Sequence, residues 1–131
     1  MAQRCFMIGK IHRATITEAR VDYEGSLSVC PKLLEASGIH PHERVDVYNL
    51  ENGERLHTYV IPGEPGEICL NGAAALKGAV GQMVIIVAYA WLSMDEYAHL
   101  RPKVVLVDKS NRIVTESFQD AVGQSSGAVD A

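Results

Sequence analysis

Residues 83–92, MVIIVAYAWL, are the longest apolar run in this chain and limit what it can fold into. Val, Ile, Tyr and Trp favour extended structure, and a continuous apolar run is typical of a strand that is covered on both faces. Residues 83–91 are therefore predicted to form a central, buried strand. The run is far shorter than a membrane span, so we expect no association with a membrane.

A second strong signal is the Asn52-Gly53 pair, which lies between two segments that favour β structure. Asn-Gly is typical of a tight β-hairpin turn, because both residues tolerate positive φ. Residues 44–50 and 55–61 are therefore predicted to form a hairpin. Alternation along its second strand would place Arg55, His57 and Tyr59 on one face.

Helices are predicted to be few and short. Residues 32–37 suit a helix in which Pro31 is tolerated in the first turn and Gly38 ends the last one. Ser93 and Glu96 form a capping-box pattern, which predicts a second helix that ends near residue 100.

The other predicted elements are strands at 5–17, 21–24, 68–71, 104–107 and 113–115, and a helical turn at 72–75. Many short strands with few helices favour a small β-barrel with helical decorations. We expect one domain over residues 1–118. The small, polar segment at 119–131 is expected to be a disordered tail.

Charge and cysteine usage exclude several classes of protein. A net charge of −4 argues against a broad nucleic-acid surface, and the N-terminus lacks the pattern of a signal peptide, so we expect a cytoplasmic protein. Cys5, Cys30 and Cys69 are widely spaced and form no metal or redox motif, so they are expected to be reduced and buried. His40 and His42 flank Pro41, where a solvated loop is favoured over a metal site.

The remaining polar residues form short groups within the β segments: Lys10 and His12; Tyr23, Glu24, Gly25 and Ser26; Arg55, Thr58 and Tyr59; and Asn71 with the small residues that follow it. Each group has an ordinary interpretation when it is taken alone. Gly25-Ser26 is typical of a turn, and Lys10 and Arg55 are typical surface charges. Spacing alone does not show that the groups converge.

Taken together and in this order, the groups resemble the pyruvoyl-dependent L-aspartate α-decarboxylase family. The matching stretches are GKIHRATIT, YEGS, LLEASGI, VDVYNLENGERLHTYVI, NGAAA and VGQMVIIVAYA, which run from about residue 7 to residue 113. The resemblance implies a double-psi β-barrel and a homotetramer with active sites between subunits. It also implies an enzyme that converts L-aspartate to β-alanine and CO2, which supplies pantothenate and coenzyme A synthesis.

In this family the protein cuts its own Gly-Ser bond, so the resemblance implies cleavage between Gly25 and Ser26. The products would be a short chain, 1–25, and a long chain, 26–131, that begins with a pyruvoyl group made from Ser26. Glycine lacks a Cβ, so we expect Gly25 to allow strained backbone angles at the cut. Neither pyridoxal phosphate nor a metal ion is expected.

The resemblance also implies roles for the other groups. The pyruvoyl group would act as an electron sink, and Tyr59 would donate a proton to the former α-carbon, since a phenol is protonated at neutral pH. Arg55 and Lys10 would hold the two substrate carboxylates. The remaining implied site residues are Thr58, Gly72, Ala73 and Ala74, which contact substrate, and His12, Tyr23, Glu24 and Asn71, which support the site.

Two departures from the family pattern are Leu76, where a His often follows NGAAA, and Val29-Cys30 after the Ser26 strand, where Ile-Asp is common. Cys is a poorer helix cap than Asp, so cleavage is expected to be slower at most. A non-catalytic double-psi binding module and a relative that acts on another acidic amino acid stay open as alternatives. A maturation factor is also possible, since some relatives use one.

Overall fold

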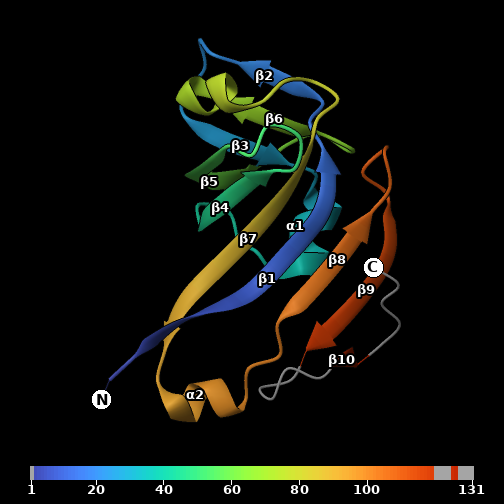
Figure 1. Cartoon of the computed structure of the whole chain (residues 1–131). Coiled ribbons are helices and arrows are strands. Elements are labelled where there is room, and N and C mark those ends of the chain that lie inside the picture. The colour runs from blue at the N-terminus through green and yellow to red at the C-terminus, as the bar shows by residue number, and fades with distance from the viewer. Residues whose placement is uncertain (1, 120–124, 127–131) are drawn as a thin grey trace.

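The computed structural model describes residues 2–119 and 125–126, which form one mixed β-sheet of ten strands with three short helices (Figure 1). The strands are β1 (Arg4–Thr15), β2 (Glu18–Arg20), β3 (Ser26–Val29), β4 (Arg44–Asn49), β5 (Arg55–Pro62), β6 (Ile68–Asn71), β7 (Met83–Leu92), β8 (Lys103–Val107), β9 (Ile113–Gln119) and β10 (Ser125–Ser126). The helices are α1 (Pro31–Ser37), the 3₁₀ helix η1 (Gly72–Lys77) and α2 (Met94–Ala98). The predicted mainly β fold with short helices is confirmed, whereas the barrel and the cut chain stay predictions.

The predicted central strand is β7, which pairs antiparallel with β1 on one side and with β4 on the other. Val84, Ile86 and Ala88 point into the core. The far end of the strand is different, because Trp91 is 66% exposed. The prediction of a strand buried throughout was wrong there, since β1 and β7 extend past the core towards α2 (Figure 1).

A second group of short strands packs at one end of the molecule. The order of strands in the sheet is β10-β9-β8-β1-β7-β4-β5-β3-β6-β2. Strand β3 therefore lies between β5, to which it is parallel, and β6, to which it is antiparallel. This position joins the segment that begins at Ser26 to two distant strands, since Leu27 pairs with Val60 on β5 and Ser26 pairs with Asn71 on β6.

The strand predicted at 21–24 was wrong. Residues 21–25 form the turn between β2 and β3, and the strand begins only at Ser26. The β-favouring residues Val21 and Tyr23 are both about half exposed, at 54% and 50%. Their propensity for β structure is overridden, because the residues that pair with β5 and β6 begin only after the turn, at Ser26.

The core brings both groups of strands together in one cluster of buried side chains. Ile11, Ile86 and Val47 form a row across β1, β7 and β4, and all three are essentially inaccessible to solvent. Leu27 on β3 and Leu70 on β6 face each other in the same cluster. The ends of β3 and β6 are thus held by the same packing that holds the long strands.

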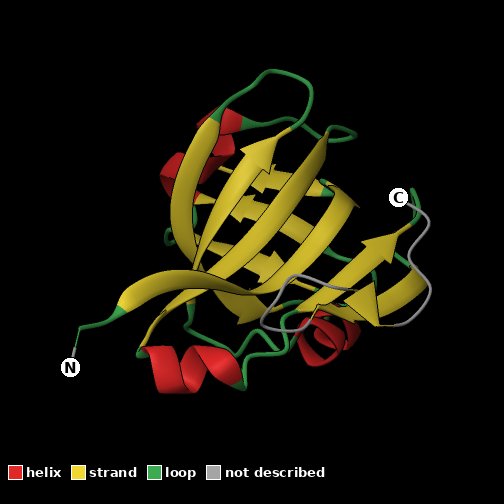
Figure 2. Ribbon diagram, turned by 60° about the horizontal axis from the view of Figure 1, so that its bottom comes forward, coloured by secondary structure: helices red, strands yellow, loops and turns green. Residues whose placement is uncertain are grey.

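The local signals for helices and turns are confirmed. Gly38 follows α1 in the left-handed region, at φ 72°, and Gly53 has φ 73° in the hairpin turn. The Ser93 hydroxyl accepts from the Glu96 amide, and the Glu96 carboxylate accepts from the Ser93 amide, so α2 has the predicted capping box. Figure 2 shows the helices at the margin of the strands.

The cysteines only partly follow the prediction. All three are free thiols, and Cys30 and Cys69 are buried, but Cys5 is exposed. Cys5 pairs with Trp91 on the part of β1 that extends past the core. None of the helices in the described ranges is long and apolar enough to cross a membrane. Of the predicted tail, residue 119 ends β9 and 125–126 form β10, while 120–124 and 127–131 lie outside the described residues.

Candidate functional site

The turn that ends at Gly25 leads into a buried serine. Ser26 opens β3 with 1% of its surface exposed, whereas residues 21–25 are exposed. The glycine that is sterically required here is Gly72, at φ 66°, because a Cβ on it would lie 2.8 Å from the Gly25 Cα. Gly25 itself has no positive φ and has open space where a Cβ would be. Gly25 is therefore not in the left-handed region in the uncut chain, and the role predicted for it at the cut stays a prediction.

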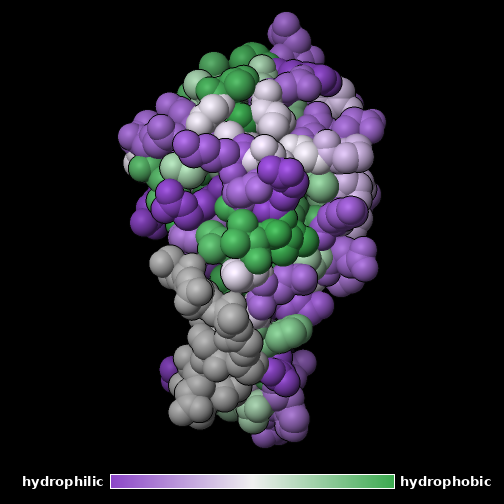
Figure 3. Space-filling view, turned by 90° about the vertical axis from the view of Figure 1, so that its right-hand side faces the viewer, coloured by the Kyte–Doolittle hydropathy of each residue, from purple (hydrophilic) through white to green (hydrophobic). Residues whose placement is uncertain are grey.

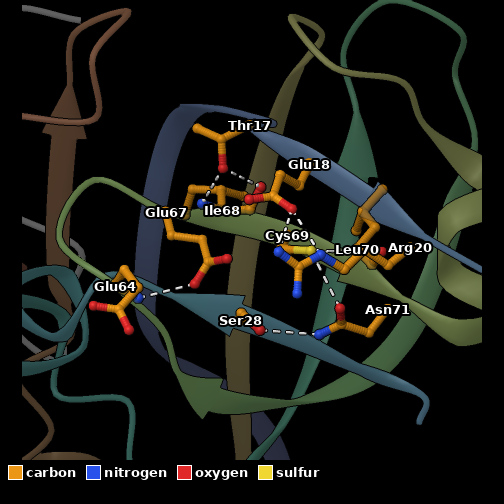
Figure 4. Close-up of polar contacts among 10 residues, drawn as sticks. All are labelled: Thr17, Glu18, Arg20, Ser28, Glu64, Glu67, Ile68, Cys69, Leu70 and Asn71. Atoms are coloured by element: carbon orange, nitrogen blue, oxygen red, sulfur yellow. Dashed lines mark hydrogen bonds and ion pairs between the residues drawn. The ribbon is translucent and has the colours of Figure 1, made fainter. Parts of the chain in front are cut away.

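A hydrogen-bond network surrounds the Ser26 hydroxyl. The hydroxyl donates to the Glu24 carbonyl oxygen at 3.3 Å and accepts from the Asn71 Nδ2 at 3.0 Å. The same Nδ2 donates to the Ser28 hydroxyl at 2.9 Å, and the Cys69 thiol donates to the Asn71 Oδ1 at 3.2 Å (Figure 4). Asn71 is therefore bonded at both ends of its carboxamide.

The register of β3 against β6 explains why these side chains meet. Ser26 is opposite Asn71, and Ser28 is opposite Cys69, so all four side chains lie on one face of the strand pair. The alternate residues, Leu27 among them, point into the core. Ser26 and Asn71 were predicted as site residues from the sequence, whereas Ser28 and Cys69 were not. Their i, i+2 spacing from Ser26 and Asn71 is the signal that could have found them.

Two carboxylates lie next to the Cys69 thiol. Ligand atoms of Glu18, Glu67 and Cys69 lie within 4.8 Å of one another, and Glu18 also forms an ion pair with Arg20. Burial, followed by the charge of Glu67, raises the pKa of the Cys69 thiol above its ordinary value. The thiol already donates to Asn71 and Glu18 already holds a cation, so we assign no metal ion to this group.

Tyr59 and Thr58 lie on the strand that flanks Ser26 on its other side. Leu27 is paired with Val60 in the parallel register of β3 and β5. Continuing this register by one residue brings Tyr59 beside Ser26, at about the 4.8 Å spacing of neighbouring strands. Tyr59 is 38% exposed, and its ring centroid lies 6.3 Å from that of His42. The predicted proton donor and the predicted cut are thus neighbours within one chain.

Arg55 lies on the outer face of the hairpin. Its guanidinium carbon is 4.6 Å from the centroid of the Tyr48 ring. The Tyr48 hydroxyl donates to Asp46 at 3.1 Å and shares a hydrogen bond of 2.8 Å with the Tyr89 hydroxyl. Burial, followed by the hydrogen bond with Tyr89, raises the pKa of Tyr48. This aromatic support for Arg55 was also missed by the sequence analysis.

The prediction that Arg55, His57 and Tyr59 share one face is confirmed, since they alternate with the less exposed Leu56 and Thr58. Arg55 is nevertheless four residues from Tyr59, or about 13 Å along an extended strand. The hairpin therefore presents a basic residue and a phenol at two separate points.

Lys10 lies three strands away from β5 in the order of the sheet. It is paired with Val87 on β7, Val87 with Asp46 on β4, and Asp46 with His57 on β5. These three strand spacings separate the Lys10 and His57 backbones by about 14 Å. The backbones of Lys10, Arg55 and Ser26 thus lie at separate places along the sheet of one protomer.

The supporting residues lie at the edges of these groups. Desolvation by burial, followed by the charges of Lys10 and Arg13, lowers the pKa of His12, and its Nδ1 has no hydrogen-bond partner among the described residues. Tyr23 and Glu24 are exposed in the turn before the predicted cut.

After Asn71, the 3₁₀ helix η1 begins at the buried Gly72. Ala73 is exposed and Ala74 is half-buried. This start of η1 lies against the turn, since a Cβ on Gly72 would also come within 3.0 Å of the Tyr23 carbonyl oxygen. The predicted NGAAA group is thus next to the predicted cut.

A cavity of about 550 Å³ lies elsewhere, between α1, the loop before β6 and the turn before β9. It is lined by Cys30, Pro31, Lys32, Leu33, Pro65, Gly66, Ser110, Asn111, Arg112 and Ile113. None of these is a predicted site residue. Figure 3, which faces the β8 and β9 side, shows an apolar area surrounded by hydrophilic side chains.

Comparison with known proteins gives the same family as the groups above. The profile described as aspartate decarboxylase matches residues 2–114. An aspartate 1-decarboxylase of Bdellovibrio bacteriovorus is 53% identical over 111 residues, covering 85% of this chain and 90% of the relative. The aspartate 1-decarboxylase of Caldicellulosiruptor saccharolyticus is 55% identical, over 85% of this chain and 88% of the relative. That of Carboxydothermus hydrogenoformans is 50% identical, over 91% of this chain and 95% of the relative. The chain therefore belongs to the aspartate decarboxylase family.

Proposed function

We propose that this protein converts L-aspartate to β-alanine and CO2 with a pyruvoyl group that it makes from its own Ser26. Relatives named aspartate 1-decarboxylase, about half identical over most of the chain, support the activity. The observation that carries the proposal is the buried Ser26 hydroxyl, bonded to Asn71 directly after the exposed Gly25 turn. By this proposal the enzyme is a cytoplasmic lyase that supplies pantothenate synthesis.

The cut would proceed in three balanced steps. The Ser26 Oγ attacks the Gly25 carbonyl carbon, and an ester bond replaces the peptide bond while the amide nitrogen becomes an amine. Elimination then removes the Ser26 Cα hydrogen as a proton and breaks the Cβ–Oγ bond, which releases the carboxylate of Gly25 and leaves a dehydroalanine. Water adds to this residue, ammonia leaves, and the new N-terminus is a pyruvoyl group.

The residues present fit such a group at position 26. The Asn71 Nδ2 already faces this position as a donor, so it can donate to a ketone oxygen as it does to the hydroxyl. Burial by β6 and η1 limits the access of water. Asn71 would therefore hold the group, with the Gly72 backbone against it.

The group would supply a carbonyl that reacts with the substrate amine and takes up the electron pair left by CO2. Tyr59, beside position 26, is suited to donate the proton that replaces CO2 on the former α-carbon. Arg55 is suited to hold a carboxylate with two parallel hydrogen bonds, and Lys10 offers a second positive charge.

Within one protomer, Arg55 is about 13 Å from Tyr59 along β5, and Lys10 lies three strand spacings away from β5. We therefore propose that a second copy of the chain supplies them, within a homotetramer. The outer face of β4, β5 and β7 carries partly exposed aromatic residues, which are common in protein interfaces. Thr58, Ala73 and Ala74 would contact the substrate from the chain that contains Ser26.

Intact-mass analysis of the freshly purified protein under denaturing conditions tests the cut. We expect two fragments separated between Gly25 and Ser26, with the larger one lighter by one ammonia than simple hydrolysis predicts. Release of labelled CO2 from L-aspartate, compared with L-glutamate, then tests the activity. A chain that stays whole on prolonged warming and releases no CO2 would contradict the proposal and favour a binding module. Whole chains that mature in a cell lysate would indicate a maturation factor.

A further inference from the structure

The buried Cys69 thiol is connected to the proposed cut by two consecutive hydrogen bonds, with the Asn71 carboxamide between them. The nearer acceptor of the thiol is the Asn71 Oδ1 at 3.2 Å, since the Leu70 carbonyl oxygen is 3.9 Å away. The Asn71 Nδ2 donates in turn to the Ser26 hydroxyl at 3.0 Å. Cys69 and Asn71 are each only 1% exposed, so water does not compete for these contacts. The thiol touches neither Gly25 nor Ser26 and can act on them only through Asn71.

The direction of the chain follows from counting hydrogens. A serine hydroxyl has one hydrogen, and that of Ser26 is directed to the Glu24 carbonyl oxygen. The hydroxyl must therefore accept from Asn71, which requires the NH2 end of the carboxamide to face Ser26. The Oδ1 end then faces Cys69, and this acceptor requires a donor on the sulfur.

The groups around Cys69 keep that donor in place. The carboxylates of Glu18 and Glu67 lie near the sulfur, while Arg20, the nearby cation, is paired with Glu18. Burial and the Glu67 charge raise the pKa of the thiol, so the sulfur stays protonated at neutral pH. A thiolate at this position would repel the Asn71 Oδ1, because both atoms would be hydrogen-bond acceptors and neither could donate.

We propose that Cys69 is a positioning residue, whose thiol holds the Asn71 carboxamide with its NH2 end towards residue 26. This inference rests on the proposed cut at Gly25-Ser26. A carboxamide can turn by 180° and exchange its donor and acceptor ends. In the turned state, the Asn71 Oδ1 would face Ser26 and would accept the hydrogen of the Ser26 hydroxyl. That hydroxyl would then no longer donate to the Glu24 carbonyl oxygen.

The same orientation suits both stages of the proposed function. Before the cut, the NH2 end holds the Ser26 oxygen through an N–H donor. After the cut, a ketone oxygen has no hydrogen to offer and can only accept, so an Oδ1 in the same place would repel it. A donor at position 69 thus keeps the Asn71 carboxamide in one orientation, which suits the Ser26 hydroxyl before the cut and a ketone oxygen after it.

The test compares Cys69→Ala, which removes the donor, with Cys69→Ser, which restores a donor of similar size. The rate at which newly made chains split into two fragments is followed by intact mass. We expect Cys69→Ala to slow the split by about five- to tenfold, the usual effect of one lost hydrogen bond, and Cys69→Ser to stay within about twofold of the parent. Equal rates for the two variants would overturn the proposal.

Cys30→Ala is the matched control, because Cys30 is also a buried free thiol but donates no hydrogen bond to Asn71. We expect it to split at the parent rate. A parent chain that never splits would refute the proposed function rather than the role of Cys69, since the second measurement below does not need the cut.

Infrared difference spectra detect the thiol hydrogen bond directly, in cut or uncut protein. The S–H band that disappears in Cys69→Ser should lie at lower frequency than the band that disappears in Cys30→Ala, as a hydrogen-bonded donor requires. If Cys69→Ala fails to fold, this pair of spectra still decides the question. Two bands at the same frequency would show that Cys69 does not hold Asn71.

Discussion

The site residues fall into two regions that differ in how complete they are. The network of Ser26, Ser28, Cys69 and Asn71 is buried, and its hydrogen bonds all close within one chain. The outer face of β4 and β5 carries Arg55 and Tyr59 partly exposed to solvent. The buried Asn71 carboxamide is fixed in one orientation by hydrogen bonds at both ends. The exposed Arg55 guanidinium contacts the Tyr48 ring and is held less firmly.

By the proposed function, this difference would separate making the pyruvoyl group from using it. The atoms needed to cut the chain are neighbours along β3 and β6, so one folded protomer contains them. The charges that would recognise a dicarboxylate lie elsewhere on the sheet, with Arg55 about 13 Å from Tyr59 along β5. By the proposal above, a second copy of the chain would supply them. Each region should therefore fail in its own way when it is altered.

The largest expected effect is that of Ser26→Ala. Alanine has neither an attacking oxygen nor a leaving group, so the chain should stay whole and inactive while its fold is kept. Intact mass and circular dichroism check this expectation. A Ser26→Ala chain that still splits between residues 25 and 26 would place the nucleophile elsewhere.

Tyr59→Phe should divide the two functions within one variant. The phenyl ring keeps the packing against His42 but has no proton to donate, so splitting should continue while kcat falls by about 100-fold or more. The readouts are the fragment masses and CO2 release from the same sample. Full activity in this variant would remove the role of Tyr59 as proton donor.

Arg55→Ala should split normally but lose kcat/KM for aspartate by roughly 30- to 1000-fold, as expected for removing a charged partner of the substrate. If the sites lie between subunits, co-expression with the Ser26→Ala chain should restore activity. Random mixing would complete about a quarter of the sites, those that combine one intact Ser26 with one intact Arg55. No recovery in mixed tetramers would mean that each chain supplies its own arginine.

The smallest effect concerns pH. The folded protein holds the pKa of His12 below 6.5, chiefly by burial and then by Lys10 and Arg13. The unfolded chain therefore binds more protons in this range, and the free energy of unfolding should fall as the pH drops through and below about 6.5. Urea titrations of the uncut Ser26→Ala chain near pH 7.5 and near pH 5.5 measure this loss in the free energy of unfolding. His12→Asn should reduce this loss, and an unchanged loss would assign it to other groups.

Signals that act over a few residues predicted this fold well, and pairing between distant segments did not follow from them. The Asn52-Gly53 turn and the Ser93–Glu96 cap depend on neighbours in sequence, and both appear as predicted. The strand at Ser26 depends on partners on β5 and β6, so propensity placed it too early, at 21–24.

The same distinction applies to the candidate site. Family resemblance named Ser26 and Asn71 and implied their roles, but no local pattern says that Cys69 would meet an amide. That contact follows from the register that sets Ser28 opposite Cys69. The separation of Arg55 from Ser26 likewise appears only when the strands are assembled.

The place of strand β1 in the sheet would give the proposed cut a lasting consequence. The strand runs between β7 and β8, with Ile11 and Ala14 fully buried, and it belongs to the fragment that would end at Gly25 (Figure 1). This fragment would stay in place through the sheet after the bond is broken. Folding would no longer be a first-order event, however, because denatured fragments would have to find each other and dilution would favour their separation. A matured molecule would thus be able to keep its shape but not to regain it alone.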